Sequence, residues 1–412
     1  MSTTVRFGVN YVPSGEWFYS WLAPRWDRIR RDLEAIAALG LDHIRVLPLW
    51  PVLQPNRTLI REAALIDVRR VVRLAGEAGL DASVDVLQGH LSSFDFVPSW
   101  LSSWHRRNMF TDPECVAAQA ALVEAVHGAV ADLPNYLGLT LGNEVNQFSS
   151  RPHPTPMPAT PEEVGAWLDA LLGAVPSDGR GVRLHAAYDA VWYQDGHPFL
   201  PTHASRYGEV TAIHSWIFNG TAQHYGAMSQ PSVRHAEYLI ELSRAYAAER
   251  SRPVWLQEIG APLNCLTESE APEFCRRAVL AAASSDALWG VTWWCSHDVP
   301  RALGDFPELE YSLGLFDAEG QVKPIGKAFA EVAAEVRAGG RPAARTTAVR
   351  IPAALDRAAL APGGAVFTAW MEAAARGERP ALVLAGDGHR FEQVLPPAPS
   401  GTAGVYNAVS AT

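Results

Sequence analysis

Short apolar runs alternate along the chain with longer segments in which apolar residues recur every three or four positions. The first run covers residues 5–11, and the segment after it places Ile29, Leu33 and Ile36 on one helical face before Gly40 ends the helix. The same alternation continues to about residue 336. It predicts strands at residues 5–11, 43–48, 82–88, 137–143, 182–188, 210–215, 253–258 and 288–294.

The segments between these strands carry helix-start signals. Asp112-Pro113 reads as an N-cap followed by proline at the first helical position, and Thr160-Pro161-Glu162-Glu163 reads as a capping box. Strict alternation of strands and helices favours parallel strands joined by right-handed crossovers. Eight such units predict an α/β protein with a closed (β/α)8 TIM barrel. No Gly-x-Gly-x-x-Gly follows the first strand, which counts against a dinucleotide-binding sheet.

A break in the pattern follows the last barrel helix, at Gly339-Gly340-Arg341-Pro342. Beyond it, residues 344–351 and 381–384 read as strands around a helix at 366–376. We therefore expect a catalytic barrel over residues 1–338 and a small C-terminal β-rich module over residues 341–412.

Composition narrows the range of partners. Lys plus Arg number 34 and Asp plus Glu number 44, so the formal net charge is −10, and neither nucleic acid nor an anionic membrane surface is expected as a partner. No apolar run is long enough to span a membrane, and the first residues lack a signal-peptide pattern, so we expect a cytoplasmic protein. The four cysteines form no C-x-x-C pair, which favours reduced, buried thiols. The oligomeric state stays open.

Candidate chemistry is sought at the C-terminal ends of the strands, where barrels carry their catalytic groups. Glu144 follows the fourth predicted strand and Glu258 ends the seventh, so the two lie nearly opposite each other across an eight-stranded ring. Two inward carboxyls about 5–5.5 Å apart are the arrangement of a retaining glycosidase, in which one is the acid/base and the other the nucleophile.

Further residues around the same rim resemble those of a known family. The motifs are QGHLSSFDF at residues 88–96, GNEVNQF at 142–148 and WWCSHD at 293–298, together with Arg45 in the second strand and His214 in the sixth. This ordered set resembles glycoside hydrolase family 5, and within it the bacterial subfamily 18. The members of that subfamily act as β-mannosidases, including on the mannose-β-1,4-N-acetylglucosamine unit of N-glycan cores.

The resemblance implies a role for each matching residue. Glu144 would be the general acid/base and Glu258 the nucleophile. Asn143 would bond the sugar 2-hydroxyl, and Arg45 would keep the nucleophile ionised. The remaining expected substrate-binding residues are His90, His214, Trp216, Trp293, Trp294, His297 and Asp298. Either Trp293 or Trp294 would lie under the sugar, and the sequence does not say which.

One position departs from the family pattern. Two residues after His214 the family commonly has a tyrosine whose hydroxyl touches the nucleophile, whereas this chain has Trp216. An indole donates through its N–H only, so the hydrogen bonds of the nucleophile are left undecided. Tyr188 or Tyr225 could take the place of the missing phenol.

We thus expect a retaining exo-β-glycosidase of the β-mannosidase type that acts on short oligosaccharides without a cofactor. No metal site is expected, because Cys295, His297 and Asp298 have no second ligand group at a compatible spacing. Two alternatives stay open. The same site could serve a β-glucosidase, an endo-β-mannanase or an endo-glucanase, or the barrel could bind sugars without cleaving them.

Overall fold

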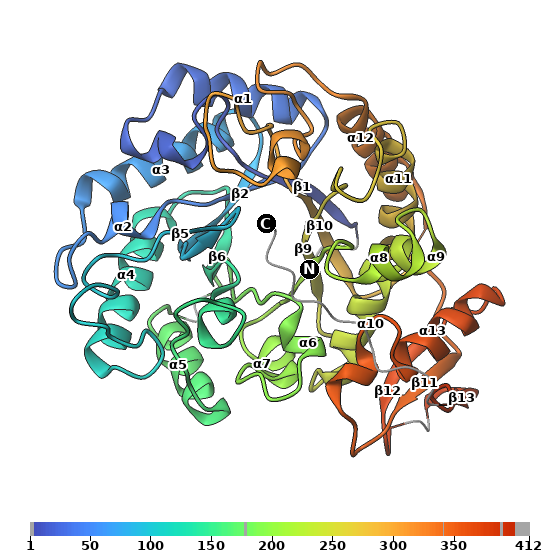
Figure 1. Cartoon of the computed structure of the whole chain (residues 1–412). Coiled ribbons are helices and arrows are strands. Elements are labelled where there is room, and N and C mark those ends of the chain that lie inside the picture. Colours follow the sequence, from blue (N-terminus) through green and yellow to red (C-terminus); the bar gives the residue numbers. More distant parts are fainter. Residues whose placement is uncertain (1–3, 177–178, 341, 388–389, 400–412) are drawn as a thin grey trace.

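The computed structural model describes residues 4–176, 179–340, 342–387 and 390–399. Its main sheet has eight parallel strands in the order β7-β6-β3-β2-β1-β10-β9-β8, which form the ring at the centre of Figure 1. The predicted (β/α)8 barrel is therefore confirmed. The strands are β1 (Arg6–Asn10), β2 (His43–Val46), β3 (Asp81–Leu87), β6 (Tyr136–Gly142), β7 (Val182–Leu184), β8 (Thr211–Ser215), β9 (Val254–Ile259) and β10 (Leu288–Trp293).

Helices surround the barrel on its outside. The long ones are α1 (Trp26–Ala38), α3 (Glu62–Glu77), α4 (Pro113–Val130), α5 (Pro161–Gly173), α10 (His235–Tyr246), α11 (Ala271–Ala283) and α12 (Pro324–Ala338). Both predicted caps are present, because the Asp112 side chain accepts from two backbone N–H groups of α4 and Thr160 forms a capping box with Glu163. No helix among the described residues is both long and apolar enough to cross a bilayer.

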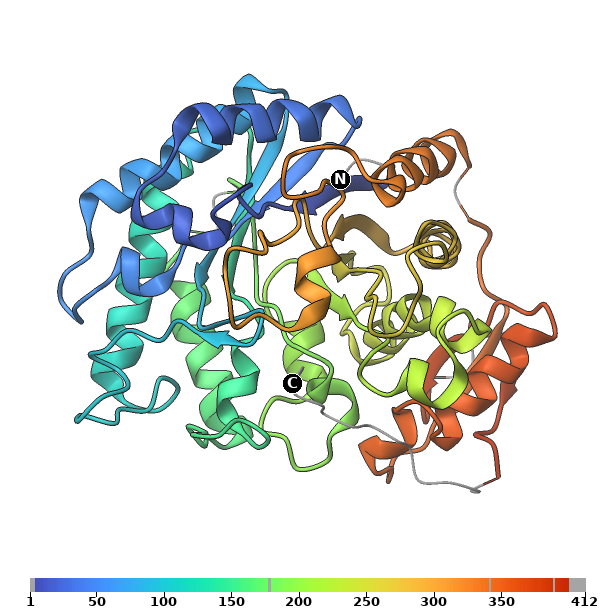
Figure 2. The ribbon, with the colours of Figure 1, turned by 45° about the horizontal axis from the view of Figure 1, so that its top comes forward.

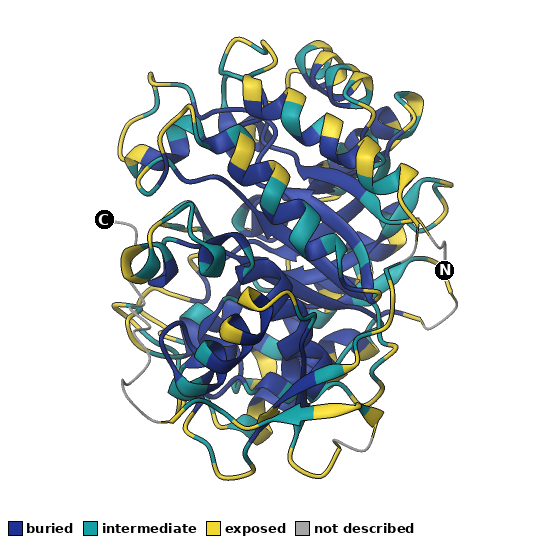
Figure 3. Cartoon of the chain, turned by 90° about the vertical axis from the view of Figure 1, so that its right-hand side faces the viewer, coloured by how far each residue is buried: buried dark blue, intermediate teal, exposed yellow. Residues whose placement is uncertain are grey.

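Short elements lie in the connections between the strands and the long helices. They include the hairpin of β4 (His90–Leu91) and β5 (Phe94–Asp95), the helices α2 (Trp50–Leu53), α6 (Ala190–Tyr193), α7 (Pro201–Arg206), α8 (Thr221–Tyr225) and α9 (Gln230–Val233), and the 3-10 turns η1 (Trp17–Leu22), η2 (Val145–Ser149) and η3 (Glu308–Ser312). Figure 3 shows the strands as the buried interior and the exposed positions on the outer faces of the helices. The core therefore lies inside the barrel and beneath the helices.

The seam between β7 and β8 lacks a strand ladder among the described residues. In its place, the Glu209 N–H donates to the Arg183 carbonyl at 2.9 Å, and the Glu209 carboxylate accepts from the Arg183 N–H at 2.6 Å and from its guanidinium. The prediction that this strand reaches residue 188 was wrong. The chain leaves the sheet early because its polar groups bond to neighbouring loops, as when the Tyr188 N–H donates to Asn146 Oδ1 at 2.9 Å.

Residues beyond the last barrel helix build a second, smaller sheet. Its parallel strands are β12 (Ala381–Leu384), β11 (Thr347–Ile351) and β13 (Gln393–Leu395), in that order, with α13 (Ala365–Ala375) and η4 (Arg357–Leu360). In Figures 1 and 2 this part lies against α10. The expected small C-terminal β-rich module is present. Its expected boundaries, 341–412, stay a prediction, and residues 400–412 lie outside the described part of the chain.

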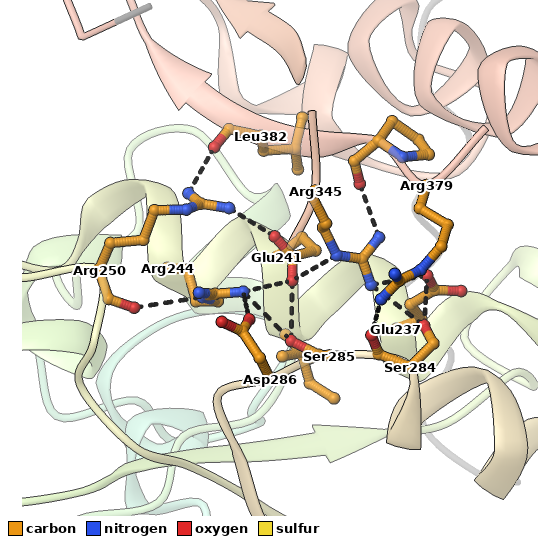
Figure 4. Close-up of polar contacts among 12 residues, drawn as sticks. Glu237, Glu241, Arg244, Arg250, Ser284, Ser285, Asp286, Arg345, Arg379 and Leu382 are labelled. Atoms are coloured by element: carbon orange, nitrogen blue, oxygen red, sulfur yellow. Dashed lines mark hydrogen bonds and ion pairs between the residues drawn. The ribbon is translucent and has the colours of Figure 1, made fainter. Parts of the chain in front are cut away.

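Buried ion pairs join this module to the barrel (Figure 4). Glu241 in α10 pairs with Arg244 and Arg250 of the barrel and with Arg345 of the module. Arg345 also donates to Glu237 at 2.8 Å, and Arg250 donates to the Leu382 carbonyl at 2.9 Å. Glu237 and Glu241 are fully buried, so these charges are neutralised by arginines rather than by water.

Candidate active site

Glu144 stands where β6 ends and η2 begins. Its backbone is left-handed (φ 48°), a conformation that costs on the order of 1–2 kcal/mol for a residue with a Cβ. The Glu144 Oε1 atom lies 2.7 Å from His214 Nδ1, and Oε2 accepts from Gln147 Nε2 at 2.7 Å. These contacts hold the carboxyl over the mouth of the barrel.

Glu258 lies on β9, across the barrel from Glu144. Its Oε1 accepts from Arg45 Nη1 at 2.8 Å and its Oε2 from Trp216 Nε1 at 3.2 Å, with His214 Nδ1 3.4 Å from Oε2. One oxygen of each carboxyl and one His214 nitrogen all lie within 4.8 Å of one another. The two carboxyls that the sequence singled out are therefore neighbours.

A strand irregularity helps to aim Glu258 inward. In the pairing of β8 with β9 the register shifts, so that Ile213 is opposite Leu256 while His214 is opposite Glu258. Such a bulge re-aims side chains next to a site. It lets the consecutive residues Gln257 and Glu258 both contact His214, which strict alternation along a strand does not allow.

Arg45 lies fully buried beneath the two carboxyls. Its guanidinium donates to Glu258, to Asn10 Oδ1 at 3.0 Å and to Asn143 Oδ1 at 2.8 Å. Two further donors bond Asp85 on β3, at 2.8 and 2.5 Å. Every polar hydrogen of this side chain is thus engaged, and its planar fork fixes the site in one geometry.

Sequence reasoning missed Asp85. The signal was present, because an acidic residue inside the apolar run Val84-Asp85-Val86-Leu87 must be paired once it is buried. The partner could not be named, because Arg45 is 40 residues away and on another strand. The pairing of β2 with β3 brings them together.

His214 connects the two carboxyls. Its Nδ1 faces Glu144 and Glu258, while its Nε2 lies 3.3 Å from Gln257 Oε1, and Gln257 Nε2 in turn donates to Thr140. Both ring nitrogens therefore face acceptors. Burial acts to lower the pKa of His214, but the adjacent carboxylates of Glu258 and Glu144 outweigh it and raise the pKa above the usual value. The carboxylates thus favour the protonated form of the ring.

The two carboxyls differ in what surrounds them. Burial raises the pKa of Glu258 above its usual value, reinforced by the charge of Glu144 and opposed by His214 and Arg45. Burial also acts on Glu144, but there the hydrogen bond and charge of His214 prevail and lower the pKa. The carboxyls and the imidazole share protons and titrate as one group.

The same three side chains could also surround a cation, since they offer three ligand atoms within 4.8 Å. The arrangement fits a metal poorly. Arg45 already places a positive charge 2.8 Å from Glu258, and the two carboxylates favour the protonated form of His214 between them. The negative charge of the pair is thereby balanced by the protein itself.

A cavity of about 370 Å³ opens above these groups. Of the predicted site residues, six line it: His90, Asn143, Glu144, Trp216, Glu258 and Trp294. Arg45 and His214 lie buried behind this lining, where both contact the Glu258 carboxyl and Arg45 also contacts Asn143. The other lining residues are Ser92, Ser93, Asp95, Gln147, Ser150, Arg151, Pro152, His153, Pro154, Tyr188, His197, Phe218, Asn219, Leu309 and Glu310.

Three predicted substrate-binding residues lie elsewhere. Trp293 points away from the cavity and packs against Phe329 of α12, with ring centroids 5.3 Å apart. His297 is buried, stacks on Phe316 and contacts the Val12 carbonyl. Asp298 pairs with Lys323 at 2.8 Å. These predictions do not match the structure, because the chain turns after β10 and uses both polar side chains to anchor its own loop.

Trp216 resolves the departure from the family pattern. Its indole N–H donates to Glu258 at the place where a tyrosine hydroxyl was expected. Tyr225 does not take that place. Tyr225 stacks on Phe367 of the C-terminal module, with ring centroids 5.8 Å apart, while Tyr188 lines the cavity from the loop after β7.

The chain was compared with known proteins. No protein-family model and no curated protein matches it. Among solved structures, a GH5_18 (glycoside hydrolase family 5, subfamily 18) from Bifidobacterium longum subsp. infantis is 50 % identical, with a TM-score of 0.96, and the match covers 99 % of this chain and 100 % of that one.

Two further structures of such proteins hold a sugar. A Glu-to-Ala variant of a GH5_18 from Bifidobacterium longum subsp. longum, in complex with Manβ1-4GlcNAc, is 49 % identical with a TM-score of 0.96 over 98 % of this chain and 99 % of that one. A Glu-to-Ala variant of a GH5_18 from Streptomyces cattleya, in complex with the same disaccharide, is 50 % identical with a TM-score of 0.93 over 96 % and 99 %.

Proposed function

Because this chain belongs to glycoside hydrolase family 5, subfamily 18, we propose that it is a retaining exo-β-mannosidase that releases mannose from Manβ1-4GlcNAc. The observation that carries the proposal is the pair of carboxyls of Glu144 and Glu258 within 4.8 Å at the base of a cavity. Relatives of half-identical sequence were crystallised with this disaccharide, which supports the choice of substrate.

In the first step Glu258 attacks the anomeric carbon and forms a glycosyl ester, while the glycosidic oxygen leaves with a proton from Glu144. Arg45 and Trp216 hold the attacking carboxylate in place and leave it little freedom to turn. Catalysis by such fixed donors needs no rearrangement as charge develops.

His214 supplies the proton that Glu144 passes on. Its Nδ1 lies 2.7 Å from Glu144 Oε1, and the charge of Glu258 is one of the influences that raise the pKa of His214. When Glu258 becomes an ester it loses that charge, so the pKa of His214 falls and the proton moves toward Glu144 and the leaving oxygen.

In the second step Glu144 takes a proton from water, and the resulting hydroxide displaces Glu258 from the anomeric carbon. The proton returns to the His214–Glu144 pair as Glu258 regains its charge. Two displacements at one carbon keep its configuration. A carboxyl separation within 4.8 Å supports this course, because inverting enzymes hold their carboxyls about 6.5–9.5 Å apart.

Cavity size supports action on short sugars. A volume of about 370 Å³ is near the lower end of the range of about 300–1,000 Å³ that is usual for small-molecule pockets. Such a cavity suits one or two sugar rings at the end of an oligosaccharide rather than an extended polymer.

The test is a panel of 4-nitrophenyl β-glycosides followed by digestion of Manβ1-4GlcNAc and of linear mannan. We expect the highest kcat/KM on the β-mannoside, mannose as the product, and β-mannose as the first anomer seen by NMR. Preference for the β-glucoside, or internal cleavage of mannan, would reject the proposed specificity. A first product in the α configuration would reject the retaining course.

We also place the activity in the cytoplasm and without a metal. All four cysteines are free thiols, which supports a reducing compartment. Cell fractionation tests the location. Dialysis against EDTA is expected to leave kcat/KM unchanged, whereas a loss that Zn²⁺ or Mn²⁺ restores would show that the carboxyls and His214 hold an ion.

A further inference from the structure

A third carboxyl, that of Glu310, lines the cavity and takes no part in the mechanism above. It lies in η3, on the loop that follows β10, and only 8 % of the residue is exposed. Glu308, two positions earlier in the same turn, instead points into solvent and pairs with the exposed Arg301. The turn thus presents one carboxyl outward and one into the sugar cavity.

Glu310 has no cationic partner among the ion pairs of the described residues, unlike Glu258. Burial raises the pKa of Glu310 to about 7, although the Ser92 hydroxyl and the Trp294 indole beside it act in the opposite direction. A buried carboxyl without a compensating charge costs folding free energy. A ligand that offers hydrogen-bond donors would offset this cost.

The loop that carries Glu310 is held firmly. The Glu310 N–H donates to the Pro307 carbonyl at 3.0 Å, and the Glu310 carbonyl accepts from Val299 at 3.3 Å. Lys323 bonds both the Ser312 carbonyl and Asp298. Asp298, which the sequence analysis assigned to sugar binding, therefore helps to fix this loop instead. The backbone at Glu310 is thus fixed by contacts within the protein itself.

The position of Glu310 in the cavity indicates which sugar of the substrate it would face. Its electrostatic neighbours are Glu258 and His90, and Trp294 lies beside it. The sugar whose anomeric carbon meets Glu258 must occupy this side of the cavity. The leaving group lies toward Glu144, where Gln147 provides further lining.

We propose that the Glu310 carboxylate accepts hydrogen bonds from hydroxyl groups of the terminal sugar and thereby selects which sugar is cleaved. The inference deepens the proposed function and rests on it. Its basis is a buried carboxyl that lines the same cavity as Glu258 and has no cationic partner among the ion pairs of the described residues. A site built to bond a hydroxyl discriminates strongly against an analogue that lacks it, because its own polar group is then left unpaired.

The experiment is a double-mutant cycle in which the carboxylate is removed from the enzyme and single hydroxyls are removed from the substrate. Wild type, Glu310→Gln and the matched control Glu308→Gln are assayed on 4-nitrophenyl β-mannoside and on its 3-, 4- and 6-deoxy analogues. We expect wild type and Glu308→Gln to lose at least about tenfold in kcat/KM on one or two of the analogues. Glu310→Gln should lose a similar factor on the parent sugar and should no longer distinguish those analogues.

The inference would be overturned if each deoxy analogue lost the same factor in kcat/KM with Glu310→Gln as with wild type. The same cycle can be measured by calorimetry, as the binding of mannose and the deoxymannoses. It then tests the role of Glu310 separately from the proposed β-mannosidase activity. A wild type that binds these sugars but hydrolyses no β-mannoside rejects the proposed function, while the binding cycle still decides the role of Glu310. Glu310→Asp, which shortens the side chain but keeps its charge, replaces Glu310→Gln if the latter does not fold.

A second readout separates sugar contact from a purely structural role. The titratable groups that face Glu310 are Glu258 from β9, His90 from β4 and Cys295 after β10. Because an ionised carboxylate is the stronger acceptor, the ratio of kcat/KM between wild type and Glu310→Gln should rise from about pH 6 to about pH 8. A ratio that stays constant over this interval would count against a direct contact with the sugar.

Discussion

Arg45 is the residue on which the geometry of the site depends. It bonds two acidic groups and two amides from four different strands or strand ends, and none of its surface reaches solvent. A lysine has the same charge but only three donors on one nitrogen, so it cannot make the five hydrogen bonds that the guanidinium makes. The shape of the guanidinium, and not its charge alone, holds Glu258 in place.

Arg45→Lys should therefore reduce kcat on 4-nitrophenyl β-mannoside by at least about a hundredfold, or about 3 kcal/mol. It should also lower the melting temperature, because Asp85 is left partly unpaired. Kinetics and thermal melting measure the two effects. The control is Arg69→Lys, which alters a solvent-exposed pair with Asp132 and should change neither by much. Near-normal kcat in Arg45→Lys would mean that the charge alone is sufficient.

The two carboxyls can be told apart by chemical rescue. Glu258→Gln should abolish turnover without unfolding the protein. Glu144→Ala should keep slow formation of the glycosyl ester from a substrate with a good leaving group, and added azide should speed its breakdown because the anion needs no general base. Product analysis should find β-mannosyl azide. Rescue of the Glu258 variant instead, with an α-mannosyl azide, would exchange the two assignments.

At the level of elements, periodicity predicted the barrel strands and long helices well, because each depends on apolar residues that recur over a few positions. The hairpin β4–β5 was not predicted, since it has only two residues in each strand. This hairpin carries Asp95, whose two oxygens lie 3.0 Å from His90 Nδ1 and 3.0 Å from His153 Nε2. It thus ties two loops of the cavity rim together.

Asp95→Asn should loosen this tie, since an amide cannot accept from both rings through two charged oxygens. The carboxylate lies at the rim and does not touch the reacting carboxyls, so we expect KM to rise several-fold while kcat changes less than twofold. Steady-state kinetics on Manβ1-4GlcNAc measures the changes in KM and kcat separately. Asp317→Asn, on a turn outside the cavity, is the control. A fall in kcat at constant KM would place Asp95 in the chemistry instead.

For the molecule as a whole, the buried charges around Glu241 join barrel and module. Burial alone would raise the pKa of Glu241, but Arg345, Arg244 and Arg250 outweigh it and hold the pKa at about 2. A carboxyl with a depressed pKa stabilises the fold above its unfolded value of about 4.3, and this contribution disappears as the pH falls toward 2. The shift corresponds to about 3 kcal/mol.

Glu241→Gln should lower the free energy of unfolding at pH 7 by about 3–5 kcal/mol, because three arginines, two of them with buried side chains, lose their shared partner. The loss should shrink as the pH falls from about 5 toward 2, where the wild-type carboxyl is itself protonated. Urea unfolding at several pH values measures it. Glu335→Gln, which breaks an exposed pair with Arg276, should cost less than about 1 kcal/mol. A pH-independent difference would show that the charge of Glu241 is not what stabilises the docking.

The sequence alone was enough to predict the barrel, the approximate bounds of its strands, and the two glutamates at strand ends. These features depend on local alternation and on the rule that strand ends of a barrel share one rim. It could not show which of Trp293 and Trp294 lines the cavity, that His297 and Asp298 anchor a loop, or that Asp85 pairs with Arg45 and Glu310 lines the cavity. Those answers depend on the register between strands, on the bulge in β9 and on loop paths, and each of these is set by contacts between residues far apart in the chain.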